Sequence, residues 1–135
     1  AWRQPPEWRD VPIWPREDLP LLTVEIDHLC WISQLEATIK SPPGHTAPSP
    51  PLDPHACRFG HWLDLSGRDR YGSYASFQHV EQAHERVHAV GCEIDRLARE
   101  DREAARRQFS DLYTPRDELL QALARLREEV QSGRV

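Results

Sequence analysis

The length, composition and charge of the chain limit it to a few classes of protein. Its 135 residues, of which 39% are hydrophobic, suffice for one domain with a modest core. The net charge of −5 argues against a nucleic-acid surface, which needs clustered excess Lys and Arg, and no apolar run approaches the roughly 20 residues that span a bilayer.

Residues 1–20 contain five prolines and three tryptophans among charged side chains. Proline at this density cannot sustain a helix and favours an extended chain. We therefore predict an extended N-terminal arm or linker at 1–20 and one domain at 21–135. So much tryptophan ring area is seldom left in water. The arm is therefore expected either to dock onto the domain or a partner, or to be a disordered end of the chain. The chain also holds no methionine, even at position 1, so we expect a fragment of a longer protein or a processed form.

The first expected helix begins near Leu22 and ends before Pro42. Apolar residues recur in it at helical spacing. They predict a core-facing stripe: Ile26, Leu29, Ile32, Leu35 and Ile39.

An irregular connector is expected at 41–54, which holds six prolines and one glycine. His45 and His55 in and after this connector are expected to be solvated rather than metal-binding. A compact stretch, 57–72, follows.

Helical periodicity resumes near Tyr74, after turns expected at Gly67 and Gly72, and continues to Ala98. A further helical segment follows around Phe109. The last helix is expected to begin with Thr114 as its N-cap and proline at its first position. No stretch alternates convincingly with period two. The sequence therefore predicts an all-α fold, an antiparallel four-helix-type bundle with a proline-rich connector and an extended N-terminal arm.

The segment His84-Glu85-Arg86-Val87-His88 places two imidazoles one helical turn apart on the apolar stripe. Buried together without a metal, they would need separate hydrogen-bond partners and would repel if protonated, whereas one zinc ion satisfies both. His28 also lies on the core-facing side of its helix. We therefore expect three imidazoles to converge on a metal between two helices.

The same segment reads H-E-x-x-H, the zinc-protease signature in which the glutamate is the general base. The metzincin continuation holds as far as Gly91 but fails at the third histidine, where Ile94 stands. A Met-turn is impossible without methionine, and no strand is predicted to hold a substrate. Peptidase activity is therefore the least favoured interpretation, and Glu85 is expected to be a solvated helix residue.

Four separated motifs resemble the chemoreceptor zinc-binding domain, the CZB family, over about residues 22–94. These motifs are Asp27-His28-x-x-Trp31, the run from Cys57 to Leu63, Gly67-Arg68 with Tyr71-Gly72, and Phe77 with Glu81, His84 and His88. The resemblance implies a bacterial cytoplasmic sensory domain, a helical bundle that is often dimeric and that holds Zn²⁺ through three histidines and one cysteine. Carried onto this sequence, the ligands are His28, Cys57, His84 and His88. Such a closed tetrahedral shell leaves no position for a catalytic water, so we expect no enzyme activity.

The resemblance further implies attachment to a signalling output, a chemotaxis receptor or an enzyme that makes cyclic di-GMP, and a homodimer as the assembly. We expect zinc occupancy or oxidation of Cys57 to control that output, because a metal-bound thiolate can be oxidised while imidazoles resist mild oxidants. The alternative is a dimerisation module in which zinc is purely structural. Three cysteines make no disulfide framework and fit the reducing cytoplasm. Neither nucleic acid nor a membrane is expected as a partner.

Side chains around the ligands carry further expectations. Trp31 and Trp62 are expected to shield the site or simply to fill the core. Asp27, Glu81 and Glu85 are candidates to orient ligand imidazoles, although each alone is better explained as a solvated charge.

The remaining cysteines and one histidine also have expected roles. Cys30 and Cys92 are expected to be small buried residues, with Cys92 as a weak candidate for a replacement ligand or a resolving thiol for Cys57. His61 is a possible competitor for the metal during loading.

Overall fold

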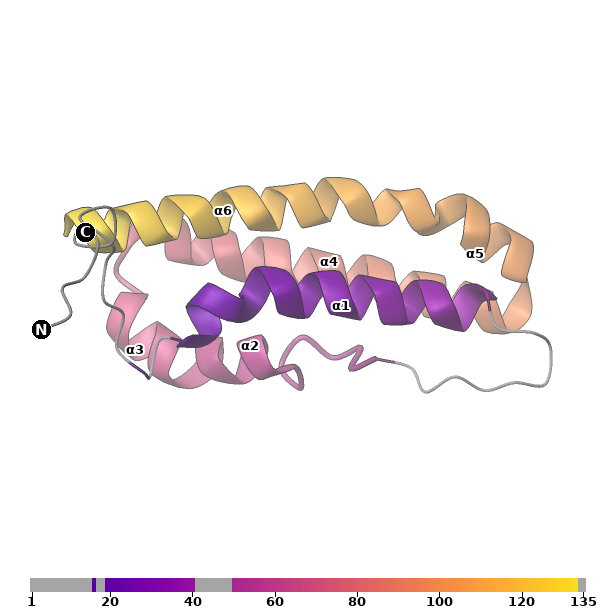
Figure 1. Cartoon of the computed structure of the whole chain (residues 1–135), viewed down its shortest axis with the longest axis horizontal. Coiled ribbons are helices and arrows are strands. Elements are labelled where there is room, and N and C mark those ends of the chain that lie inside the picture. Colours follow the sequence, from indigo (N-terminus) through magenta and orange to yellow (C-terminus); the bar gives the residue numbers. More distant parts are fainter. Residues whose placement is uncertain (1–15, 17–18, 41–49, 134–135) are drawn as a thin grey trace, which may run out of the picture.

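The computed structural model describes residue 16 and residues 19–40 and 50–133. Four helical segments make up this part of the chain, and each runs antiparallel to the one before it (Figure 1). The first segment is α1 (Leu19–Lys40) and the third is α4 (Ala75–Glu100). The second consists of α2 (Arg58–Trp62), the π-helical η3 (Leu63–Gly67) and α3 (Arg68–Tyr71). The fourth consists of α5 (Arg102–Gln108), the 3₁₀-helical η4 (Phe109–Leu112) and α6 (Tyr113–Ser132).

This architecture confirms the predicted all-α bundle, and no strand occurs within the described ranges. Helix α1 begins at Leu19, two residues inside the predicted arm, while the rest of the arm lies almost wholly outside the described residues. Of the predicted connector at 41–54, residues 41–49 lie outside them too, and 50–54 are irregular as expected; the irregular chain continues to residue 57. None of the described helices combines the length and apolar character needed to cross a membrane.

The core-facing side of α1 differs in part from the predicted stripe. Ile26 and Leu29 are 65% and 49% exposed. The buried residues of the helix are Leu21, Val24, His28, Trp31, Ile32, Leu35 and Ile39. Because α1 carries apolar residues on opposite sides, their spacing identifies a helix without selecting the side that faces the core.

Gly67 does not form the predicted turn, because the backbone is helical without interruption from Arg58 to Tyr71. The reason for a glycine there is close packing: a Cβ at Gly67 would lie 2.8 Å from the Trp62 ring. The continuous second segment positions Cys57 at its N-terminal end, against α1 and α4.

The predicted Thr114 N-cap is also wrong. Helix α6 begins at Tyr113, after Leu112, because η4 leads directly into it with right-handed helical backbone and no side-chain cap. Pro115 lies in the first turn, where the missing N–H removes no intrahelical hydrogen bond.

Two contacts from α6 fix the positions of α1 and α4. The Glu129 carboxylate accepts from the Ser76 hydroxyl at 2.7 Å and from the Ser76 backbone N–H at 3.2 Å, and so caps the start of α4. Arg127 donates to Glu25 of α1 at 2.6 Å. The helices that carry the histidines are thus both held by the last helix.

Candidate metal centre

The structure brings the four expected ligand residues together in the middle of the bundle. His28 comes from α1, Cys57 from the residue before α2, and His84 and His88 from α4, and one donor atom of each lies within 4.8 Å of all the others. The Cys57 Sγ is 3.2 Å from His84 Nε2. A tetrahedral zinc site, with bonds of about 2.3 Å to sulfur and about 2.0 Å to nitrogen, separates its donors by about 3.3–3.6 Å. Shifts of about 1 Å would therefore convert the cluster into such a shell.

Local helix geometry explains why these residues meet. His84 and His88 stand one turn apart on the buried face of α4, with ring centroids 4.7 Å apart. The His28 ring stands edge-on to both, at 5.0 Å from His84 and 5.7 Å from His88. The three imidazoles thus crowd one another in a region that excludes water.

Backbone carbonyls fix the tautomers of two of these imidazoles. His28 Nδ1 lies 3.0 Å from the Val24 carbonyl and His88 Nδ1 lies 3.0 Å from the Leu52 carbonyl. A carbonyl can only accept, so each Nδ1 carries the proton and donates it. Each Nε2 is left with a free lone pair, the state that a metal ligand needs.

His88 Nε2 supplies the test of fit for a metal. Among the described residues, this nitrogen is the buried side-chain polar atom that has no hydrogen-bond partner. An unsatisfied buried acceptor costs about 1–3 kcal/mol. A metal bond would satisfy it, and three imidazole nitrogens with one sulfur are a donor set that zinc prefers. The residues present therefore fit a zinc ion.

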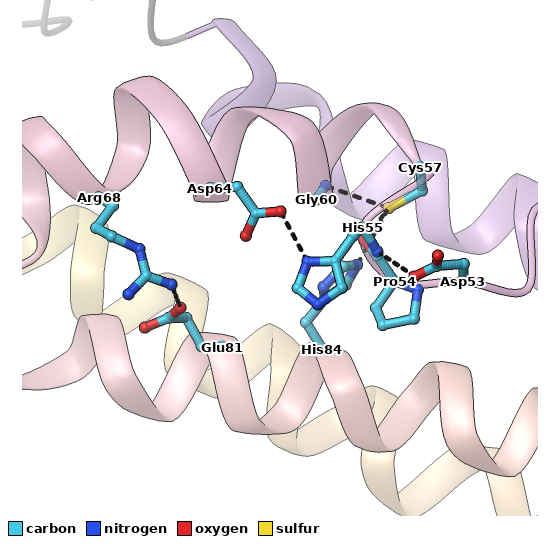
Figure 2. Close-up of polar contacts among 9 residues, drawn as sticks. All are labelled: Asp53, Pro54, His55, Cys57, Gly60, Asp64, Arg68, Glu81 and His84. Atoms are coloured by element: carbon cyan, nitrogen blue, oxygen red, sulfur yellow. Dashed lines mark hydrogen bonds and ion pairs between the residues drawn. The ribbon is translucent and has the colours of Figure 1, made fainter.

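Cys57 occupies the N-cap position of α2, where backbone N–H groups point outward. Its Sγ accepts from the Gly60 N–H at 3.2 Å, a contact drawn in Figure 2. Helix N-termini favour a thiolate over a thiol. The Gly60 N–H thus helps to stabilise the anionic form of Cys57.

The electrostatics of the metal-free cluster oppose positive charge on its imidazoles. Burial, together with the neighbouring imidazoles, lowers the pKa of His84 to about 2. Burial lowers the pKa of His88 to about 4 despite the Leu52 hydrogen bond, and it also lowers the pKa of His28. All three rings are therefore neutral at physiological pH and ready to bind a cation.

Burial also raises the pKa of the Cys57 thiol, although the Gly60 N–H acts in the opposite direction. Without a cation, the thiol therefore keeps its proton at neutral pH. A metal ion would reverse this preference, because it deprotonates a coordinating thiol.

Residues 28–94 match the family model described as the chemoreceptor zinc-binding domain, CZB. This segment belongs to that family. The match begins at His28 and includes all four residues of the cluster. No curated protein and no solved structure gives a significant match. The family consists of sensory signalling domains rather than enzymes, and together with the donor set it indicates zinc as the metal.

Trp31 covers the cluster of three histidines and Cys57 on the side of His88. The two ring centroids are 4.8 Å apart, and the Trp31 indole N–H donates to the Pro51 carbonyl at 2.6 Å. A Cβ at Gly91 would lie 2.0 Å from the Trp31 ring. The glycine that extends the protease-like motif is therefore explained by packing, because it makes room for the indole beside His88.

Phe59 rather than Trp62 places an aromatic ring against His84 and His28. Its ring stands edge-on to His84 at 5.2 Å and to His28 at 6.0 Å, while Trp62 stacks on Phe59 at 5.7 Å. Sequence reasoning missed this role, although the position of Phe59 two residues after Cys57 was a usable signal.

The acidic candidates for orienting ligands have other partners. Asp27 pairs with Arg58, whose Nε lies 3.1 Å from Asp27 Oδ2, and Glu81 pairs with Arg68 at 2.5 Å, as Figure 2 shows for the second pair. Glu85 is exposed, as expected of a solvated helix residue. Orientation of His88 by the Leu52 carbonyl could not be read from the sequence, since it depends on the tertiary approach of 50–57. The Val24 carbonyl that His28 contacts lies one turn earlier in α1 itself.

The remaining histidines and cysteines lie around the cluster. His55 is exposed as expected, and its Nδ1 contacts Asp64 at 2.7 Å, which raises the pKa of His55 (Figure 2). His61 is exposed, and His45 lies outside the described residues. The predicted burial of Cys30 and Cys92 is wrong, because both are exposed. Each lies on a helix that also carries a candidate ligand, Cys30 two residues after His28 and Cys92 four residues after His88.

Proposed function

We propose that this chain is a zinc-binding sensory domain in which His28, Cys57, His84 and His88 hold one Zn²⁺ ion. The observation that carries the proposal is the convergence of four donor atoms within 4.8 Å in a chain with the CZB signature. The bound ion would supply a positive charge that keeps Cys57 as the thiolate and joins α1, α4 and the start of α2. Residues 21–135 would act as one unit.

The sensing step that this arrangement supports is the loss of Cys57 as a ligand. Cys57 differs from the other ligands because its sulfur can be oxidised, and it sits at a junction between irregular chain and a short helix. Its release would uncouple α2 from the histidines of α1 and α4. Zinc removal would act on the same contacts. Metal binding in small zinc-stabilised folds contributes on the order of 10 kcal/mol, enough to shift a two-state bundle.

The partners are a further part of this proposal. We propose that the bundle, as a homodimer in the bacterial cytoplasm, passes its state to a chemotaxis receptor or to an enzyme that makes cyclic di-GMP. The reducing cytoplasm suits a thiolate ligand. No contact with nucleic acid or membrane is part of this proposal.

Metal content and X-ray absorption at the zinc edge test the site. The parent chain should hold one zinc per chain with one sulfur and three nitrogens, and Cys57→Ala should lose the sulfur. Cys92→Ala is the matched control, because Cys92 is exposed and lies one turn beyond His88 on α4. A sulfur-free shell in the parent, or a shell that loses its sulfur in Cys92→Ala, would refute the assignment.

A dimerisation module with purely structural zinc is the second candidate. The exposed apolar side chains of Ile26 and Leu29 on α1 favour it, because an outward-facing apolar stripe suits a helix partner. Light scattering of the zinc-loaded, chelated and oxidised protein separates the two functions. A structural module keeps its mass and circular dichroism after mild oxidation, whereas a sensor changes at least one of them.

A zinc hydrolase is not supported by the geometry. Cys57 provides a fourth donor where a hydrolase needs an open position, and Glu85, which would be the general base, is exposed.

A further inference from the structure

A cavity of about 210 Å³ lies between α1 and the start of α2 and has two of the three cysteines in its lining. Cys57 and His28 line its inner side, and Cys30 lies two residues beyond His28 on α1. Its volume is several times that of a single water site, so a small oxidant fits inside it. The cavity thus provides a path from solvent to Cys57, with the exposed Cys30 along that path.

The walls of the cavity keep the two cysteines on facing elements. Arg58, the residue after Cys57, donates to Asp27 of α1 at 3.1 Å, one helical turn before Cys30. The Trp31 N–H donates to the Pro51 carbonyl at 2.6 Å, which holds the segment before Cys57 against the residue after Cys30. Two hydrogen bonds, Arg58 to Asp27 and Trp31 to Pro51, therefore join the two walls of the cavity near the cysteines.

Cys92, the resolving thiol suggested by the sequence, has a different environment. The lining of the cavity includes Cys30 and Cys57 but not Cys92, and the Cys92 Sγ lies 3.5 Å from the Leu52 carbonyl. Spacing along α4 places Cys92 near His88, but it does not place the thiol on the path to Cys57.

We propose that Cys30 is the resolving thiol of the zinc site and forms a disulfide with oxidised Cys57. The inference rests on the proposed function, because it requires Cys57 as a thiolate that an oxidant attacks. The oxidant is a hydroperoxide, for which hydrogen peroxide is the probe. A disulfide needs Cα atoms less than about 7 Å apart. The irregular chain at 50–57 allows Cys57 to approach Cys30 after the cysteine leaves the metal.

The reaction proceeds in two balanced steps. The Cys57 thiolate attacks one peroxide oxygen, the O–O bond breaks, and Cys57 sulfenic acid and hydroxide form. The Cys30 thiol then attacks the Cys57 sulfur, the S–O bond breaks, and water leaves with the thiol proton. Two thiols have been oxidised, one peroxide has been reduced, and the zinc has lost one ligand.

Peptide mapping identifies which cysteines are linked, because trypsin places the three cysteines on different peptides: Cys30 on 17–40, Cys57 on 41–58 and Cys92 on 87–96. Non-reducing electrophoresis shows whether a link joins two chains. The zinc-loaded chain is treated with hydrogen peroxide, free thiols are alkylated, and a non-reducing digest is analysed by mass spectrometry. Zinc release is followed in parallel with a chromophoric chelator. The parent, Cys30→Ser and Cys92→Ser are compared, the last as the matched exposed-cysteine control.

The parent and Cys92→Ser should give peptide 17–40 linked to 41–58, with zinc release that dithiothreitol and added zinc reverse. Cys30→Ser should release zinc but carry Cys57 as sulfinic acid, and it should not recover. Zinc release with Cys57 oxidised while Cys30 stays free to alkylate would overturn this inference and leave the proposed function intact, as would a link to Cys92 or between two chains. A Cys57 that holds no zinc or resists peroxide would overturn both.

Discussion

The number of protons released when zinc binds distinguishes a preformed site from one that the metal must assemble. Near pH 6, the lowered pKa values, about 2 for His84 and about 4 for His88, leave these imidazoles unprotonated in the folded metal-free chain. The pKa of His28 is lowered too, whereas that of the Cys57 thiol is raised, so the thiol keeps its proton. Zinc should therefore displace about one proton per site.

A site that is unfolded before metal binding gives a different number. Histidines with the ordinary pKa of about 6.5 are each about three-quarters protonated near pH 6, so zinc would displace about three protons in all. The folded pKa values lie below the unfolded ones, so the unfolded state binds more protons. The stabilisation of the metal-free fold by these histidines is consequently complete well above pH 6.5 and declines as the pH falls from 6.5 towards 4. The loss approaches about 1.4 kcal/mol per pH unit for each of His84 and His88, and His28 contributes in the same direction.

Isothermal titration of zinc in two buffers with different ionisation heats measures this number directly. The parent should release about one proton near pH 6 and Cys57→Ser about none, with three imidazoles left to bind. A release of about three protons by the parent would refute the preformed, neutral cluster. A proton release unchanged in Cys57→Ser would refute the thiol as its source.

Three further predictions concern the surroundings of the site. Gly91→Ala should destabilise the fold by about 1–3 kcal/mol in urea denaturation and weaken zinc binding, because its Cβ would overlap the Trp31 ring; unchanged values would show that the ring is not held there. Phe59→Ala should cost about 3–5 kcal/mol, since the side chain is 1% exposed, and a loss below 1 kcal/mol would contradict its packing. Glu129→Gln should lower the melting temperature and cost about 1 kcal/mol of folding free energy, because it removes the charged cap of α4. The control Glu128→Gln, at the neighbouring exposed residue, should have little effect, and equal effects of the two changes would contradict the cap.

The sequence predicted the helices and the convergence of the three histidines because both depend on periodicity. His84 and His88 one turn apart, and His28 on an apolar stripe, already indicate imidazoles facing a core. Cys57 is different, since Cys30 and Cys92 are chemically equal candidates, and only the resemblance to CZB selected it. The roles of the four as ligands, the output and the homodimer stay predictions.

The errors occurred where tertiary packing decides. Ile26 and Leu29 have helical spacing, but the period does not select which of two apolar sides is buried. The carbonyls of Val24 and Leu52 leave no sequence signal, because every residue has one. Thr114 shows a good capping pattern, yet the preceding turn is already helical and leaves no cap position to fill.

The proposed ligands come from three chain segments, which gives metal binding an entropic consequence. His28, Cys57 and His84 follow one another at intervals of about 30 residues, so a shared ion closes two loops, each of which costs several kcal/mol of chain entropy in the loop-closure model. Release of Cys57 alone merges them into one loop about twice as long and frees 50–57 with the start of the second segment. The signalled state would then be a broader ensemble of chain conformations rather than a second rigid shape, and a partner that binds the ordered bundle would detect the change as lost affinity.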